Sequence, residues 1–119
     1  MTVTEITSDT QFNEILNNTS GDHKYVLVDF YAQWCGPCKA ISPKLHKLSE
    51  TYTNITFVKV DVDELQTLSE KYKITSLPTF LIFDIGKTKP INKIVGSDIK
   101  KLENALKVVT ANVKILDDF

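Results

Sequence analysis

The spacing of hydrophobic and polar residues changes several times along the chain, and each change marks a predicted element. Residues 3–6 (VTEI) alternate apolar and polar side chains, which favours a short edge strand. Ser8 followed by Gln11 forms a capping box, and the apolar residues after it predict a short amphipathic helix. Residues 25–31 (YVLVDFY) are nearly all apolar, which is typical of a strand covered on both faces. The first part of the chain therefore predicts strand, helix and strand.

Helical spacing follows the second predicted strand. Apolar residues recur at steps of three and four from Cys38 to Tyr52, which predicts a surface helix with one buried stripe. Pro43 lies inside this helix and should kink it, because proline removes one intrahelical donor. Residues 55–62 (ITFVKVDV) predict another central strand, and the apolar positions between residues 65 and 72 predict a short helix after it.

The last part of the chain predicts a hairpin and a helix. Residues 79–85 (TFLIFDI) and 91–95 (INKIV) flank a loop at residues 86–90, a spacing that suits a hairpin with an irregular loop. An apolar stripe from residue 99 to residue 113 predicts the final helix, with Ser97 placed to cap its start.

The order of these elements predicts an α/β fold with a central mixed β-sheet flanked by helices on both faces. No repeat or interdomain linker interrupts the pattern, so we expect one domain over residues 1–119, with an extended C-terminal helix or tail from about residue 107. Asp117 and Asp118 should fray the end of the final helix, because a helix carries partial negative charge at its C-terminus.

Composition narrows the classes of function. With 119 residues, 42% of them hydrophobic, the chain can bury a core without help from disulfides. The 14 basic residues are all lysines and the net charge is −1, so nothing favours a nucleic-acid surface. The N-terminus has no signal-type apolar run, and no stretch is long enough to span a bilayer. We expect a cytoplasmic monomer without membrane contact, although a mature mitochondrial form would look the same.

Both cysteines lie in WCGPCK, residues 34–39, and four interpretations compete for them. A structural disulfide closing about four residues would contribute only about 2 kcal/mol, against ~4.7 kcal/mol for a 100-residue loop. Zinc needs four ligands, and His23 and His46 match no zinc-binding spacing, so no metal is expected. Inert buried thiols are the usual reading of a lone cysteine, but a pair flanking Gly36 and Pro37 is placed for mutual bonding. A redox pair is the favoured interpretation.

Position assigns a role to each sulfur. Cys35 falls at the predicted start of the helix, where unpaired N–H groups and the helix dipole favour thiolate, so it should be the nucleophile. Cys38 shares the apolar stripe with Ile41 and Leu45, so it should face the core and act as the resolving thiol. Cys38 could then attack a mixed disulfide on Cys35 and release the reduced partner.

WCGPCK after DFYAQ, together with VDVDE, SLPTF and IVGS, resembles the thioredoxin family from about Val3 to Leu106. The resemblance implies the thioredoxin fold and a general protein disulfide reductase that works through a redox-active Cys35–Cys38 disulfide, with no bound cofactor. It also carries over a pKa of about 7 for the nucleophilic thiol. The implied partners are a thioredoxin reductase, which would supply electrons from NADPH, and disulfide-containing proteins such as peroxiredoxins and reductases.

Asp29 and Lys59 have both an ordinary and a functional interpretation. A strand aspartate usually faces solvent, but Asp29 shares a face with Leu27 and Tyr31 in an apolar strand, which favours burial and a raised pKa. Lys59 interrupts another apolar strand, where an exposed lysine is equally compatible with the pattern. The resemblance places a buried aspartate and a nearby lysine here, with the aspartate helping to move the proton of Cys38.

The resemblance also implies a docking surface for substrates. It predicts a cis Leu77–Pro78 bond, although composition alone favours trans. The backbone of Leu77 would pair with the substrate as a strand does. Trp34 would anchor the contact, with burial in the core as the alternative. The remaining residues of the implied rim are Gly36, Pro37, Val95, Gly96 and Ser97.

Two features depart from the family pattern: Tyr31 stands where many members carry tryptophan, and the chain continues past Lys107 into VTANVKILDDF. The first should leave the chemistry intact, and the role of the tail is not assigned. Two other functions stay open. One is a thiol oxidase or isomerase of the same fold, and the other is a non-catalytic thioredoxin-like binding subunit in which the cysteines are incidental.

Overall fold

The strands form one five-stranded mixed sheet in the order β1-β3-β2-β4-β5. The computed structural model describes residues 3–117, and the side chains only as far as residue 111. β1, β3 and β2 are parallel, whereas β4 is antiparallel to β2, and β5 to β4. The strands are β1 (Val3–Glu5), β2 (Tyr25–Tyr31), β3 (Ile55–Asp61), β4 (Thr79–Asp84) and β5 (Pro90–Val95). The predicted mixed sheet is confirmed, and the edge strand predicted at residues 3–6 is present but ends at Glu5.

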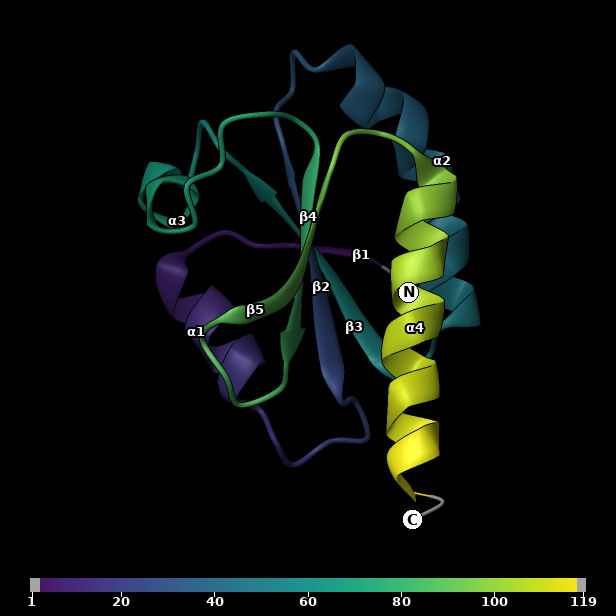
Figure 1. The fold of residues 1–119 in the computed structure, drawn as a ribbon. Coiled ribbons are helices and arrows are strands. Elements are labelled where there is room, and N and C mark those ends of the chain that lie inside the picture. Colours follow the sequence, from purple (N-terminus) through teal and green to yellow (C-terminus); the bar gives the residue numbers. More distant parts are fainter. Residues whose placement is uncertain (1–2, 118–119) are drawn as a thin grey trace.

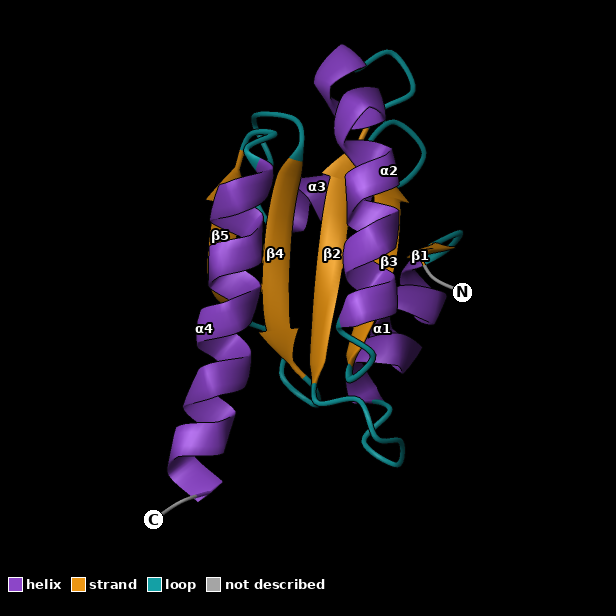
Figure 2. Ribbon diagram, turned by 90° about the vertical axis from the view of Figure 1, so that its right-hand side faces the viewer, coloured by secondary structure: helices purple, strands orange, loops and turns teal. Residues whose placement is uncertain are grey.

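Helices cover both faces of this sheet, as predicted (Figure 1). The helices are α1 (Asp9–Asn17), α2 (Gly36–Thr51), α3 (Gln66–Lys71) and α4 (Ile99–Asp117). Figure 2 shows α2 and α4 in front of the strands and α1 and α3 behind them. Alternation along β2 supplies both cores: Leu27 packs in the cluster under α2 and α4, whereas Val26 and Val28 pack in the cluster under α1 and α3.

The start of α1 follows the capping signal in the sequence. The Ser8 hydroxyl accepts a hydrogen bond from the Gln11 backbone N–H at 3.1 Å. The Gln11 side chain accepts in return from the backbone N–H of Thr7, at 2.7 Å, rather than from that of Ser8. Phe12 and Leu16 then bury the apolar face of the helix. The cap and the stripe were both predictable because they depend only on neighbouring residues.

The predicted cap of α4 at Ser97 is wrong. The helix begins at Ile99, so Asp98 precedes its first residue, and the Asp98 carboxylate accepts from the backbone N–H groups of Lys100 at 3.1 Å and Lys101 at 3.3 Å. Leu102, Leu106 and Val109 bury the predicted stripe of this helix. The side chain of Val113 and the whole of Asp118 lie outside the described residues, so the predicted fraying at the helix end stays a prediction.

β2 spans the predicted residues 25–31, whereas the boundaries of several other strands differ from prediction by one residue. β3 ends at Asp61 and β4 at Asp84, one residue earlier than expected, and β5 begins at Pro90. α2 continues through Pro43 to Thr51, and the kink expected at Pro43 stays a prediction. Across residues 3–117, no helix combines the length and the apolar character needed to cross a membrane.

Candidate functional site

The two cysteines lie at the junction between β2 and α2. Cys35 is the N-cap of α2, and its Sγ accepts from the backbone N–H of Cys38 at 3.2 Å. Gly36 and Pro37 occupy the first positions of the helix, where proline loses no hydrogen bond. Cys35 and Cys38 form a disulfide with their Cα atoms 5.3 Å apart. The structure therefore shows the oxidised state of the pair, with a backbone N–H of the helix start donating to the Cys35 sulfur.

Cys35 borders an open surface groove of about 520 Å³, called here the docking groove. Trp34 stands at its rim with 70% of its surface exposed, so burial of Trp34 in the core is excluded. The indole N–H of Trp34 donates to Asp63 Oδ2 at 2.9 Å, which fixes the ring beside the disulfide. The groove is lined by Trp34, Cys35, Gly36, Pro37, Val62, Asp63, Gln66, Ser69, Ile74, Thr75 and Leu77.

The other predicted docking residues lie beside this groove. The Leu77–Pro78 peptide bond is cis, as the family resemblance predicted. The Pro78 carbonyl accepts from the backbone N–H of Gly96 at 2.8 Å. Gly96 has a φ of +102°, a conformation that favours glycine, and it follows Val95, which is 47% exposed. Val95, Gly96 and Ser97 do not line the docking groove itself, so the structure divides the predicted rim into a groove and a neighbouring loop.

Cys38 borders a different space, called here the inner hollow, of about 320 Å³. Each cysteine exposes only 4% of its surface, so exposure alone does not distinguish them. Their surroundings do, because Cys35 lines the docking groove and Cys38 lines the inner hollow. The inner hollow is lined by Glu5, Asp29, Tyr31, Ala32, Gln33, Cys38, Lys39, Ser42 and Lys59. The structure thus brings Cys38, Asp29 and Lys59 together.

The predicted burial of Asp29 is confirmed. Asp29 exposes 4% of its surface, and among the described residues its Oδ1 has no hydrogen-bond partner. Burial raises the pKa of this carboxyl from 3.8 to about 7; the positive charge of Lys59 opposes the rise and the negative charge of Glu5 adds to it. Asp29 therefore titrates near neutral pH, and it lines the same hollow as Cys38.

Lys59 on β3 is the register partner of Asp29 on the neighbouring strand β2, but its ion pair is with another carboxylate. The Lys59 Nζ is 3.6 Å from Glu5 Oε1, and the same oxygen accepts from the Tyr31 hydroxyl at 2.6 Å. The Lys59 ammonium also lies 5.3 Å from the centre of the Tyr31 ring. Among the residues that the structure describes, Glu5 is the only ion-pair partner of Lys59. With 36% of its side-chain surface exposed, the lysine is half-buried within the site.

Three site residues were missed by sequence reasoning. Glu5 enters the site because β1 pairs with β3 in a register that places Glu5 beside Lys59. The sequence of a three-residue strand is too short to predict that register. Asp63 was visible as the second aspartate of VDVDE, but nothing nearby linked it to Trp34. Asp61 is buried, and its carboxylate accepts from Gln33 Nε2 and from the backbone N–H of Asp63.

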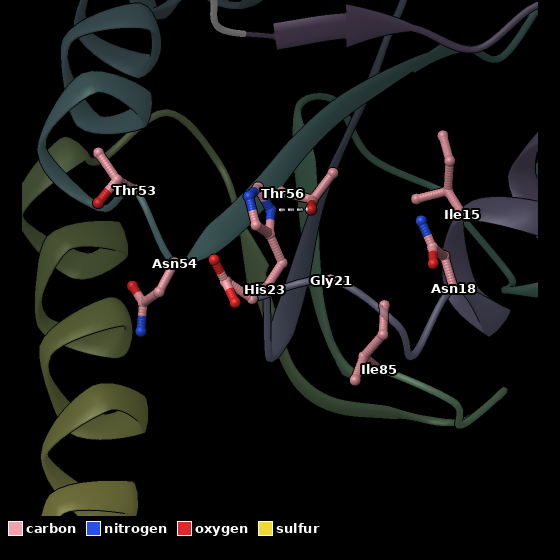
Figure 3. Close-up of a pocket in the computed structure, with 9 residues that line it drawn as sticks. Ile15, Asn18, Gly21, His23, Thr53, Asn54, Thr56 and Ile85 are labelled. Atoms are coloured by element: carbon pink, nitrogen blue, oxygen red, sulfur yellow. Dashed lines mark hydrogen bonds between the residues drawn. The ribbon is translucent and has the colours of Figure 1, made fainter.

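A third hollow lies at the opposite end of the sheet, near the start of β2 and β3 (Figure 3). It has a volume of about 550 Å³, and the His23 ring there hydrogen-bonds the hydroxyl of Thr56. It is lined mostly by exposed polar residues of surface loops. In the part of the chain that the structure describes, no three His, Cys, Asp or Glu side chains gather as metal ligands would.

Comparisons with known proteins agree with this geometry. The family model for Thioredoxin matches residues 3–108. The chain is 44% identical to Thioredoxin of Homo sapiens over 85% of its own length and 92% of that protein. It is 43% identical to Thioredoxin-2 of Pyricularia oryzae over 87% of its own length, but spans only 57% of that protein.

Solved structures show the same likeness. The crystal structure of a poplar wild-type thioredoxin h superposes with a TM-score of 0.85 and 35% identity, covering 92% of this chain and 97% of that one. The family match, the identities and the Cys35–Cys38 disulfide all indicate dithiol–disulfide exchange. The chain therefore belongs to the thioredoxin family and is a thiol–disulfide oxidoreductase.

Proposed function

We propose that this protein is a general protein disulfide reductase in which Cys35 attacks and Cys38 resolves. The observation that carries the proposal is that the two cysteines line different spaces. Cys35 lines the docking groove, where a substrate can reach it, whereas Cys38 lines the inner hollow beside Asp29. The Cys38 backbone N–H aimed at Cys35 Sγ would stabilise the Cys35 thiolate after reduction.

The proposed reaction has two exchange steps. The Cys35 thiolate attacks one sulfur of a substrate disulfide, forms a mixed disulfide and expels the other substrate sulfur as a thiolate. Cys38 then gives its proton to Asp29 and attacks Cys35 Sγ, which breaks the mixed disulfide and releases the second substrate sulfur as a thiolate that takes up a proton from water. The substrate gains two electrons, and the protein is left with the Cys35–Cys38 disulfide seen in the structure.

The residues around the groove support docking of an extended substrate segment. The exposed Trp34 ring offers an apolar contact beside the disulfide. The backbone of Leu77, next to the cis Pro78, would pair with the substrate in the manner of a strand. We assign the neighbouring loop, Val95, Gly96 and Ser97, to the same docking surface, because the Gly96 N–H donates a hydrogen bond to the Pro78 carbonyl. Each of these assignments extends the family resemblance to this chain.

The partners follow from the chemistry. Each turnover oxidises the cysteine pair, so a reductant must restore it, and we assign that step to a thioredoxin reductase using NADPH. A similar solved chain, with a TM-score of 0.79 and 35% identity, comes from a study of thiol resolution in a yeast mitochondrial 1-Cys peroxiredoxin via glutathione and thioredoxin systems. We propose peroxiredoxins and other disulfide-forming enzymes as substrates, and the cytoplasm as the compartment, with a monomer as the working form.

Two single substitutions test the roles of the sulfurs. Cys35→Ser should abolish insulin reduction in the presence of NADPH and a thioredoxin reductase. Cys38→Ser should instead accumulate covalent mixed disulfides through Cys35, detectable as thiol-sensitive adducts on non-reducing gels. Adducts that form only through Cys38 would reverse the assignment. A double serine variant that kept full biological activity would favour the binding-subunit alternative.

The oxidase or isomerase alternative depends on the redox potential. A more stable thiolate at Cys35 would make the disulfide more oxidising. Gly36 and Pro37 add no charge beside the sulfur, which leaves its stabilisation to the helix start. This sequence favours a reducing pair, and equilibration with glutathione buffers measures it directly.

A further inference from the structure

Three ionisable side chains lie in one row on three neighbouring strands and line the inner hollow that Cys38 borders. The strand registers pair Glu5 of β1 with Lys59 of β3, and Lys59 with Asp29 of β2. Residues paired in this way point to the same face of a sheet, and all three line the inner hollow together with Cys38. The order carboxylate, ammonium, carboxyl places one positive charge between two acidic groups.

The ammonium is held by the outer carboxylate. Lys59 Nζ lies 3.6 Å from Glu5 Oε1, whereas no group in the described part of the chain hydrogen-bonds Asp29 Oδ1. The Tyr31 hydroxyl donates to the same Glu5 oxygen at 2.6 Å and so fixes the position of the carboxylate. Burial, followed by its bond to Glu5, raises the pKa of Tyr31, so the hydroxyl keeps its proton and remains a donor throughout the physiological range.

We infer that Glu5 is a positioning residue, which holds the Lys59 ammonium away from Asp29 so that the Asp29 carboxylate is free to accept the Cys38 proton. The inference rests on the proposed role of Asp29 in resolution. Without Glu5, the Lys59 ammonium would be free to pair with the Asp29 carboxylate on the neighbouring strand. A carboxylate paired with an ammonium binds protons less readily, and it would be a weaker base toward a thiol.

The other groups that face Asp29 do not replace Glu5 in this role. α2 contributes Cys38 and Lys39 to the inner hollow, and β4 places the apolar Phe80 opposite Asp29. Lys39 is an exposed residue and adds positive charge, as Lys59 does. Among the residues that line the inner hollow, Glu5 is therefore the only carboxylate besides Asp29. Loss of the Glu5 charge would lower the pKa of Asp29, and closer approach of the Lys59 ammonium would lower it further.

Glu5→Gln removes the negative charge of the side chain while keeping nearly the same shape. Glutamine keeps an oxygen that can accept from Tyr31 but cannot form an ion pair with Lys59. The Asp29 carboxyl carbon should be titrated by NMR in the oxidised protein, where the disulfide-bonded cysteines do not titrate. We expect the midpoint to fall by about one pH unit from its wild-type position. Glu14→Gln, an exposed change on α1 across the sheet, should leave the midpoint unchanged.

A kinetic readout links this midpoint to the reaction. With a chromogenic aromatic disulfide, the reduced protein releases one thiol when Cys35 attacks and the second when Cys38 resolves, so stopped-flow absorbance separates the two phases. In Glu5→Gln, the pH midpoint of the second phase should move to lower pH with that of Asp29, while the first phase keeps its pH profile.

The outcomes distinguish the inference from the proposed function. An Asp29 midpoint in Glu5→Gln equal to that of wild type would overturn the inference and leave the proposed function standing. If Asp29→Asn left the pH profile of the second phase unchanged, the role of Asp29 in resolution would be lost, and the inference with it. A shifted Asp29 midpoint with an unshifted second phase would likewise refute the link to Cys38.

Discussion

Replacement of Asp29 by asparagine should make the protein more stable, and only above acidic pH. In the unfolded chain Asp29 ionises near its ordinary pKa of 3.8, whereas in the folded protein its pKa is about 7. Between these values the folded state holds a proton that the unfolded chain has lost, so the free energy of unfolding falls as pH rises. The contribution is fully present below pH 3.8 and is lost as pH passes about 7.

The magnitude follows from the width of this window. A span of roughly three pH units, at about 1.4 kcal/mol for each, corresponds to about 4 kcal/mol. Asparagine has a similar shape and no charge, so it avoids the buried carboxylate that wild type carries above pH 7. We therefore expect Asp29→Asn to match wild type near pH 4 and to exceed it by about 4 kcal/mol near pH 8.

Urea unfolding of the oxidised proteins, followed by far-ultraviolet circular dichroism at several pH values, measures this difference. Asp22→Asn, a change of the same kind in an exposed loop, should give no such pH-dependent gain. A difference between Asp29→Asn and wild type that stayed constant with pH would refute the reasoning, because an uncoupled carboxyl cannot change its effect between pH 4 and pH 8. The variant should also resolve mixed disulfides more slowly, so stability and function would change in opposite directions.

Two further predictions concern the two ends of the site. Pro37→His should raise the reduction potential by tens of millivolts, because histidine can donate a hydrogen bond or positive charge to the nucleophilic thiolate, and about 30 mV corresponds to ~1.4 kcal/mol. Equilibration with glutathione buffers reads the potential, and a value that is unchanged or lower would contradict the electrostatic argument. Asp98→Ala should cost about 1 kcal/mol of unfolding free energy through loss of the α4 cap, whereas Ser97→Ala should cost almost nothing. Equal losses in thermal or urea unfolding would restore Ser97 as a capping residue.

The elements that sequence reasoning placed well depend on contacts between near neighbours in the chain. The Ser8 cap, the stripe of α2 and the apolar run of β2 each follow from residues a few positions apart. The position of Cys35 at the start of α2 is equally local, because strand and helix periods meet there. The burial of Asp29 could be inferred as well, since its neighbours in β2 are apolar on both faces.

What sequence reasoning missed depends on contacts between distant segments or on a choice between equivalent neighbours. Glu5 reaches Lys59 only through the register of β1 on β3, which no local pattern in the chain determines. Trp34 and Asp63 are 29 positions apart, and their hydrogen bond depends on where β3 ends. Ser97 and Asp98 are both good capping residues, and only the path of the backbone into α4 decides between them.

The exposed indole beside Cys35 has a consequence for optical measurements. Trp34 is the one tryptophan of the sequence, it is 70% exposed, and its N–H is held by Asp63. Fluorescence excited at wavelengths absorbed by tryptophan but not by tyrosine therefore comes from Trp34 at the rim of the docking groove. It carries little signal from either hydrophobic core. The same emission can follow partner association or disulfide reduction in real time without an attached dye. A change in its wavelength during denaturation marks the loss of this rim, which can precede global unfolding.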